Sequence, residues 1–387
     1  MPMAEKRIPV ITYQAIAKHL ELFPDDAHRF PNFKPSTPPL LIKGSAGPLE
    51  GELHSAQYFH GRDGLGDIAN RHPELDLEPS FSQFVEENAC LKVVNDKGFD
   101  KLLDLIRSRP RRSVTYVALG PLTNLALLIQ RDRQVMMDTI GRFVSMGGAV
   151  DVPGNTSPVA EFNFFADPYA VKRLLLSGSQ SELPLDRFIL LPLDITTPHE
   201  LPFPIYKKAV DPLFSSTAEP STSLNKSPIT HFTSSFFERT REIMLEFGKD
   251  AMELHDIVAI WCAICNPPVQ DDQISEGCSL SPGWRARKRL FDIERTGELC
   301  RGMLVVDRRE DVSAYAPGAN RAEVQRLLDK LHREDDLWES TVIPARVEVE
   351  ERPVVEEAHG VWCVTHTPGP EQILRLLLKR IWNADLP

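Results

Sequence analysis

One stretch of the sequence places an acid and two amides among apolar side chains. It reads GNTSPVAEFNFFADPYAV, residues 154–171, and its polar members Asn155, Glu161 and Asn163 accompany three phenylalanines. An unpartnered polar group in apolar surroundings is costly, so these side chains need partners. The residue types therefore predict either hydrogen bonds to the backbone of a turn or a surface that binds a polar ligand.

Three other polar stretches have a similar character. YFHGRDGLGD follows an early extended segment and contains His60, GPLTN contains Thr123, and ELHDIVA begins a helix with His255 and Asp256. In an open α/β sheet, ligands bind beyond the carboxyl ends of the strands. Four polar stretches placed there can share one crevice.

Each stretch also has a purely structural interpretation. The glycines of HGRDGLGD supply a turn, and they lack the strand-to-helix context of a dinucleotide fingerprint. Thr123 caps a helix, and Asp256 suits the positive end of a helix dipole, whereas a charged His255 does not. Asn155 and Glu161 bind the backbone of a turn. The residues alone leave both interpretations open.

The segments that must position these residues alternate between strand-like and helix-like runs. VTYVALG (114–120), RFVSMGG (142–148) and RFILLPLDIT (187–196) barely alternate in polarity, as is typical of buried parallel strands. Helix-like runs follow them: PLTNLALLIQRD, DPYAVKRLLLS and THFTSSFFERTREIMLEFG. This repetition predicts an open, mostly parallel α/β sheet with helices on both faces.

Segments on either side of this region add further elements. Two runs have the apolar spacing of amphipathic helices, with faces formed by Tyr13, Ile16, Leu20 and Phe23 and by Phe99, Leu102, Leu103 and Ile106. KRLFDIERTGELCRGMLVVD predicts a β-hairpin, HGVWCVTHT a strand, and PGPEQILRLLLKRIW a closing helix entered through proline. We expect one domain over residues 1–387, with the charged segment 309–355 as a surface insertion.

Composition excludes several classes of protein. The net charge is −11 without a long basic stretch, which argues against nucleic acid as a partner. No apolar run is long enough for a membrane span, and the first residues lack the layout of a signal peptide, so we expect a cytoplasmic protein. Six scattered cysteines do not make a disulfide framework. Cys262 and Cys265 form a C-x-x-C inside an apolar run of helical spacing, which favours a packed helix over redox or zinc chemistry.

Taken together, the polar stretches resemble a known family. HGRDGLGD, ALGPLTNLA, MGGAVDVPGNTSPVAEFNFFADPYAV, LPLDITTPHEL and ELHDIVA occur here in the order and at the separations seen in the inosine/uridine-preferring nucleoside hydrolases. The most specific element is G-N-x-x-P-x-A-E-F-N-x-x-x-D-P, which is matched in full from Gly154 to Pro168. The resemblance runs from about residue 12 to the C-terminus and is weakest across 205–228 and 309–355.

The resemblance implies hydrolysis of the N-glycosidic bond of ribonucleosides to base and ribose, at a site built around Ca²⁺. Cleavage leaves positive charge on the ribose ring, so oxygens around the sugar stabilise the transition state more than the ground state. Asn155, Glu161 and Asn163 match the residues that bind the ribose hydroxyls.

The remaining candidates match the metal ligands and the acid of the family. Asp256 and the backbone oxygen of Thr123 match calcium ligands, and calcium takes six to eight oxygens. His255 is the expected proton donor to the departing base, because an imidazole can donate near neutral pH. His60 is expected to line the base pocket and to assist. The resemblance also implies a homo-oligomer.

The sequence departs from the family in one respect. Family members begin with a strand and an aspartate cluster of the form D-T-D-P-G-x-D-D, which binds calcium and activates the water, and the 387 residues contain no such run. The only adjacent acid pair near the N-terminus is Asp25 and Asp26, which lacks the glycine turn. We therefore expect about two strands and a helix of the family fold to be absent, through a truncated gene model or through evolved loss, and turnover to be impaired.

A second functional class stays open beside the hydrolase. It is a catalytically inactive homologue or fragment that acts at most as a weak ribose- or nucleoside-binding protein. The preference for purine or pyrimidine also stays open, because Phe232, Phe236 and Arg239 can face either a base pocket or the core.

Overall fold

The computed structural model describes residues 4–33, 36–76, 91–94, 97–176, 182–214, 220–268, 279–306 and 360–387. The expected surface insertion, 309–355, lies outside these residues. Within them, no helix has both the length and the apolar character needed to cross a membrane.

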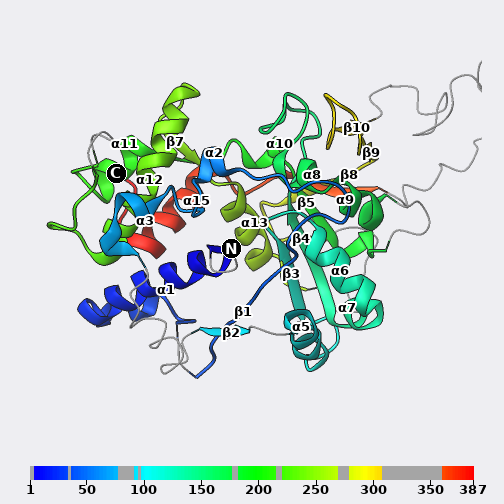
Figure 1. Cartoon of the computed structure of the whole chain (residues 1–387), viewed down its shortest axis with the longest axis horizontal. Helices are drawn as coiled ribbons and strands as arrows, with labels where there is room; N and C mark the ends of the chain where they lie inside the picture. The colour runs from blue at the N-terminus through cyan, green and yellow to red at the C-terminus, as the bar shows by residue number, and fades with distance from the viewer. Residues whose placement is uncertain are drawn as a thin grey trace, which may run out of the picture.

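A five-stranded sheet lies at the centre of the fold (Figure 1). Its strand order is β3-β4-β5-β11-β8, where the first four strands run parallel and β8 is antiparallel to β11. This confirms the predicted α/β fold with a mostly parallel sheet. The strands are β3 (Val114–Ala118), β4 (Ile140–Met146), β5 (Phe188–Leu191), β11 (Val361–His366) and β8 (Arg285–Arg289).

The third predicted strand is shorter than expected. It ends at Leu191 because Pro192 has no N–H to extend a ladder, and the backbone then turns into α10 (Leu193–Thr196). The carbonyl of Pro192 accepts hydrogen bonds from the backbone N–H groups of Ile195 and Thr196. The polar end of the predicted strand is thus a short helix at the carboxyl end of β5.

The sheet buries both of its faces, which explains why its strands barely alternate in polarity. On one face, Phe143 and Phe188 pack with apolar residues of four helices, and on the other Val144 and Ile189 pack with residues of four more. The first set is α5 (Gly98–Arg107), α6 (Thr123–Arg131), α7 (Arg133–Thr139) and α9 (Pro168–Leu175). The second is α11 (Phe203–Ala209), α12 (Pro228–Glu246), α13 (His255–Cys265) and α15 (Pro370–Leu377).

The first predicted helix exists, but its predicted buried face was wrong. Helix α1 (Ala4–Leu22) packs against α12 and buries Ile11 and Ala15. Ile16 and Leu20 of the predicted face are only half-buried, and Phe23 is 44% exposed. The apolar spacing misled because this helix also buries polar side chains that have hydrogen-bond partners, which an apolar pattern does not count.

Strand β3 forms one edge of the central sheet. Strands β1 (Leu40–Ile42) and β2 (Lys92–Val94) pair parallel with each other as a separate two-stranded sheet and make no ladder with β3. Four of the five residues of β3 are only half-buried, whereas every residue of β4 is buried. The described fold therefore has a β3 edge that no strand among these residues covers.

The other predicted elements are confirmed. Helix α5 buries Leu103 and Ile106, the predicted hairpin is formed by β9 (Phe291–Ile293) and β10 (Leu304–Val306), and α15 begins at Pro370. Cys262 is buried within α13, as a packed helix requires. Smaller elements are η1 (Pro24–Arg29), α2 (Gln57–His60), α3 (Ile68–Arg71), η2 (Pro73–Leu75), α8 (Phe162–Ala166), η4 (Leu185–Arg187), β6 (Glu200–Pro202), β7 (Ala251–Glu253) and η7 (Leu378–Trp382).

Candidate active site

The stretch 154–171 folds into a loop after β4 and the start of α8. A helix leaves its first backbone N–H groups without partners, and here side chains occupy the first three. Asn155 Oδ1 accepts from the N–H of Phe162 at 3.0 Å, Glu161 Oε1 accepts from that of Asn163 at 2.8 Å, and Glu161 Oε2 accepts from that of Phe164 at 3.1 Å. Asn155 and Glu161 thus bind backbone N–H groups of a turn, as their purely structural interpretation predicted.

Glu161 is also the link between this helix and the sheet. Its Oε2 accepts a further hydrogen bond, 2.8 Å long, from the backbone N–H of Gly148 just beyond β4. The side chain is only 2% exposed. Desolvation raises the pKa of Glu161, although backbone hydrogen bonds and the charge of His255 act in the opposite direction. The acid is therefore fixed in a buried position at the carboxyl end of β4.

Asn163 ties two strand ends together. Its Nδ2 donates to the carbonyl of Met146, the last residue of β4, at 3.1 Å, and to that of Leu119, just after β3, at 3.3 Å. The residue is 7% exposed. Asn155, Glu161 and Asn163, which we call the amide–acid wall, therefore lie at the carboxyl edge of the sheet, where the sequence predicted a site.

Thr123 begins α6 at the same edge but does not cap it. Leu122 is the N-cap residue and its side chain makes no capping bond, so the structural interpretation of Thr123 as a cap was wrong. Thr123 Oγ1 instead donates to Oδ2 of Asp167 at 2.6 Å. Asp167 is fully buried, caps α9 through Ala170, and accepts from the backbone N–H of Leu49. The threonine is used to anchor this carboxylate.

His255 begins α13 and is held through both ring nitrogens. Its Nδ1 lies 2.8 Å from Oγ1 of Thr196 in α10, and its Nε2 lies 2.9 Å from Oε2 of Glu253. Desolvation acts to raise the pKa of Glu253, but hydrogen bonds from His255 and Lys249 outweigh it and lower that pKa to about 2. Glu253 is thus an ionised partner that orients the imidazole.

Asp256 follows His255 in the first turn of α13. Its side chain is exposed, yet enough protein surrounds it that desolvation raises its pKa, against the charge of His255. The exposed carboxylate remains accessible to a cation. The first turn of a helix also favours this negative charge.

His60 lies in a different part of the fold, at the end of α2. It is followed by a tight loop in which Gly61, Gly64 and Gly66 all have positive φ, between 73° and 75°, a conformation that favours glycine. Asp63 accepts hydrogen bonds from three backbone N–H groups of this loop. The structural interpretation of these glycines as a turn is therefore confirmed, and burial lowers the pKa of His60.

The His60 loop packs against α12 rather than against α13. Arg239 of α12 donates to the carbonyl of Tyr58 at 2.7 Å, and a Cβ on Gly66 would lie 3.1 Å from Cβ of Arg239. Phe232 packs with Ile11 in a small core. No described contact joins His60 to His255.

Several residues that hold the site were not singled out from the sequence. Thr196 and Glu253 orient His255, and Asp194 accepts from the backbone N–H groups of Val150 and Asp151, which fixes the loop after β4 to α10. Thr196 and Asp194 both lie within LPLDITTPHEL, so the motif itself carried a signal for them. Glu253 likewise lies within ELHDIVA, two positions before His255.

Comparison with known protein families identifies a match to this chain. The model described as inosine-uridine preferring nucleoside hydrolase matches residues 30–335. This chain belongs to that family.

Curated relatives carry names of the same kind. "Probable uridine nucleosidase 1" of Oryza sativa subsp. japonica is 37% identical over 144 residues, which cover 37% of this chain and 39% of the relative. "Pyrimidine-specific ribonucleoside hydrolase RihA" of Shewanella oneidensis is 30% identical over 275 residues, 68% of this chain and 67% of the relative. The chain spans about two fifths of the length of the first of these relatives.

Solved structures of nucleoside hydrolases share the fold. The plant enzyme PpNRh1 gives a TM-score of 0.55 at 20% identity, covering 97% of this chain and 87% of its own. An inosine-guanosine nucleoside hydrolase gives 0.54 at 19% identity, covering 89% and 81%. These likenesses support the fold class.

The calcium ligands implied by the family make an incomplete shell in this structure. Calcium takes six to eight oxygens, and Asp256 is the only carboxylate among the expected ligands. Within the described residues, Asp256 belongs to no group of three or more His, Cys, Asp or Glu side chains with metal-ligand spacing. Asp26 is engaged elsewhere, with His19 and Arg29. These residues do not fit a complete calcium site, and we derive no catalytic step through one.

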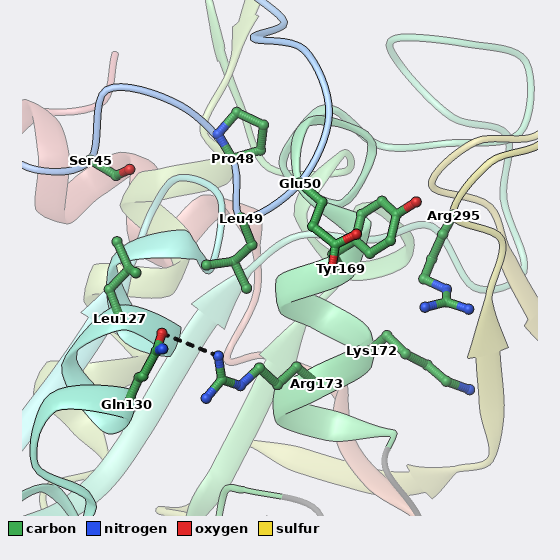
Figure 2. A pocket seen from close by; sticks show the side chains of 10 residues that line it. All are labelled: Ser45, Pro48, Leu49, Glu50, Leu127, Gln130, Tyr169, Lys172, Arg173 and Arg295. Carbon is green, nitrogen blue, oxygen red and sulfur yellow. Dashed lines mark hydrogen bonds between the residues drawn. The ribbon is translucent and has the colours of Figure 1, made fainter.

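A surface pocket of about 490 Å³ lies away from these residues (Figure 2). Three cationic side chains line it, and each has a partner. Lys172 pairs with Asp292, Arg173 pairs with Glu182, and Arg295 stacks over the ring of Tyr169. None of the predicted site residues lines it, so it carries no argument for the nucleoside site. Its lining is Ser45, Pro48, Leu49, Glu50, Leu127, Gln130, Tyr169, Lys172, Arg173 and Arg295.

Proposed function

We propose that this chain acts on ribonucleosides, by hydrolysis of the N-glycosidic bond to free base and ribose, with reduced turnover by the 387-residue polypeptide. Support comes from its family, from the names of its relatives, and from the site at the carboxyl edge of the sheet. One observation carries the proposal: Asn163 of the amide–acid wall binds the ends of β3 and β4, and His255 is held by Thr196 just after β5, so both lie at the carboxyl edge of the sheet.

The wall suits the sugar half of the reaction. Departure of the base leaves positive charge on the ribose ring, and fixed oxygens stabilise that charge more than the neutral substrate. Asn155 is exposed and its amide can meet a ribose hydroxyl. Glu161 and Asn163 are nearly buried, so their contact with a sugar needs the loop after β4 to open locally. Ribose binding by these three residues is thus part of the proposal.

His255 suits the base half of the reaction. A positioned acid that protonates or hydrogen-bonds the leaving base contributes roughly 10²- to 10⁴-fold. Both of its ring nitrogens are occupied, by Thr196 and by Glu253. Proton donation to a base therefore requires His255 to exchange one of these bonds, and the exchange of the weaker, neutral bond to Thr196 leaves the ionised Glu253 to orient the ring. His60 is proposed to line the base pocket.

The proposal also includes the metal ion and the rate of turnover. Asp256 and the backbone oxygen of Thr123 are the proposed ligands, and a bound calcium would hold the sugar hydroxyls in place. Turnover is proposed to be low because the 387 residues contain no D-T-D-P-G-x-D-D run to complete the shell and activate water. We also propose that the protein is a homo-oligomer. We propose a cytoplasmic location as well, which the free thiols of the four described cysteines suit.

Release of free base from uridine and inosine, with and without added calcium, tests this function. We expect slow, calcium-dependent release that falls by at least tenfold in His255→Gln. Calcium-dependent release at an ordinary enzymatic rate would contradict the reduced turnover.

A silent nucleoside-binding homologue is the second candidate, favoured by the incomplete carboxylate set. Equilibrium binding of ribose and uridine separates the two candidates. Binding of ribose with base release no faster than in His255→Gln supports the silent protein, whereas release above that background supports the hydrolase.

A further inference from the structure

Two histidines and a glutamate converge at a place that the nucleoside site does not use. His72 and Glu74 flank the start of η2, His231 lies in the first turn of α12, and their ligand atoms all lie within 4.8 Å of one another. Among the described residues, no other set of three His, Cys, Asp or Glu side chains meets this criterion. The two histidines are 1% and 4% exposed, whereas the Glu74 side chain is 54% exposed.

The spacing of these atoms matches the edges of a metal tetrahedron. Glu74 Oε1 lies 3.3 Å from Nδ1 of His72 and 3.1 Å from Nε2 of His231. With zinc–nitrogen and zinc–oxygen bonds of about 2.0 to 2.2 Å, two ligand atoms of a tetrahedral site lie about 3.3 Å apart. The third edge, between the two imidazole nitrogens, is no longer than 4.8 Å.

A buried carboxylate supports the metal-facing orientation of His72. Its Nε2 lies 2.9 Å from Oε2 of Glu238, a residue of α12 that is 1% exposed. Metal-bound histidines commonly donate their other ring N–H to a carboxylate, which fixes the tautomer and leaves the lone pair toward the metal. With Nε2 donating to Glu238, the neutral ring directs the lone pair of Nδ1 toward Glu74 Oε1. Two lone-pair atoms then face each other, an arrangement that a cation between them resolves.

The nearest cation does not compete for the cluster, because it already has carboxylate partners. Arg71 faces the same region and pairs with Glu238 and Glu242, so it offsets the second carboxylate rather than the proposed ligands.

We propose that His72, Glu74 and His231 form a binding site for a divalent transition metal of the zinc type, separate from the nucleoside site. Two imidazoles and one carboxylate suit zinc or cobalt rather than calcium, which prefers oxygen ligands alone. The exposed side of Glu74 leaves a fourth position for water. The metal would join the segment before and within η2 to α12, the helix that also packs against α1, α2 and α3.

Cobalt and zinc titrations of the full-length, tag-free chain test this site. The chelator-treated protein is titrated with Co²⁺, whose visible absorption reports tetrahedral nitrogen and oxygen ligands, and Zn²⁺ is then used to displace it. We expect one equivalent to bind, with affinity that falls at acidic pH as the imidazoles take up protons. The thermal midpoint should rise with zinc.

Two ligand variants and one matched control make the test specific. Glu74→Gln and His231→Gln should each weaken cobalt binding by tenfold or more and remove the rise of the thermal midpoint. Glu242→Gln, a neighbouring surface glutamate that is not a ligand, should bind as the wild type does. Because Glu74 is exposed, its variant should fold even if the buried His231 variant does not.

Three results would overturn the proposal. They are the absence of a cobalt spectrum, unchanged affinity in Glu74→Gln, and a near-ultraviolet thiolate band showing that cysteines bind the ion. If no cobalt spectrum appears, hydrogen bonds alone hold the three side chains together. Asp256→Asn should leave cobalt binding intact, which separates this site from any calcium response.

Discussion

The amide–acid wall and the start of α13 meet at the same edge of the sheet but are built in different ways. In the wall, Glu161 is buried and satisfies backbone N–H groups of Gly148, Asn163 and Phe164. At α13, His255 is partly exposed and is held by the side chains of Thr196 and Glu253. Backbone partners make a rigid surface, whereas side-chain partners can rotate away. The comparison suggests a wall that binds the sugar only after the loop after β4 opens, and an acid that can move within its side-chain contacts to reach the base.

Removal of Glu161 should have the largest effect on stability. Glu161→Ala leaves three backbone donors without their acceptor, and each buried unsatisfied group costs about 1 to 3 kcal/mol, part of which local water regains. We expect the free energy of unfolding, measured in urea, to fall by about 3 kcal/mol. Glu298→Ala, at an exposed position, is the control and should stay within about 0.5 kcal/mol of the wild type. A loss below about 1 kcal/mol would show that the wall is not rigidly built.

The ionised partner of His255 should give the next largest effect, and it should depend on pH. The pKa of Glu253 is about 2 in the folded state, against 4.5 as its ordinary value. A lowered acid pKa contributes stability that is fully present above about 4.5 and is lost as pH falls toward 2. After allowance for screening at half-exposed Lys249, this contribution is about 1 to 2 kcal/mol.

Glu253→Gln should therefore unfold more easily at neutral pH and lose less stability than the wild type between pH 4.5 and 2. Urea unfolding measured across this range checks the slope. Glu246→Gln, on the exposed end of α12, should keep the wild-type slope. Parallel curves for Glu253→Gln and the wild type would mean that the bond to His255 does not hold in solution.

The sequence predicted the positions of these regions better than their contacts. Strands such as β4 were readable because burial on both faces removes alternation, and the carboxyl edge followed from their parallel order. Backbone partners for Glu161 were one of two open interpretations, but the identity of its three N–H groups was not readable, because backbone groups leave no trace in residue types. The same limit applies to α1, where partnered polar side chains share the buried face with Ile11 and Ala15.

The cluster of His72, Glu74 and His231 shows a second limit. His72 meets His231 across 159 positions of the chain through the packing of α12. Such contacts depend on tertiary structure alone. The local motifs, by contrast, already contained Asp194, which binds the loop after β4, and Thr196 and Glu253, which hold His255.

Asn155 should give a smaller effect than Glu161, although both bind the first turn of α8. Asn155 is exposed, so water replaces its single bond to Phe162 when it is removed. We expect Asn155→Ala to lower the free energy of unfolding by about 0.5 to 1 kcal/mol. Asn155→Asp keeps the acceptor and should restore most of that loss. Equal losses in the two variants would show that the Oδ1 bond contributes nothing to the wall.

Replacement of Asp256 should have the smallest effect on the free energy of unfolding and a clear effect on calcium binding. Its pKa is raised by desolvation, so the stability linked to its protonation is lost as pH rises through the folded pKa, and the ionised form gives no net support at neutral pH. Its place in the first turn of α13 offsets part of this, so Asp256→Asn should change the free energy of unfolding by less than about 0.5 kcal/mol. Any rise of the thermal midpoint with millimolar calcium should disappear in this variant, because the amide lacks the charge that a calcium ligand supplies. If the variant keeps the calcium response, Asp256 is not a calcium ligand. If it loses more than about 1 kcal/mol without calcium, Asp256 contributes to folding stability rather than to metal binding.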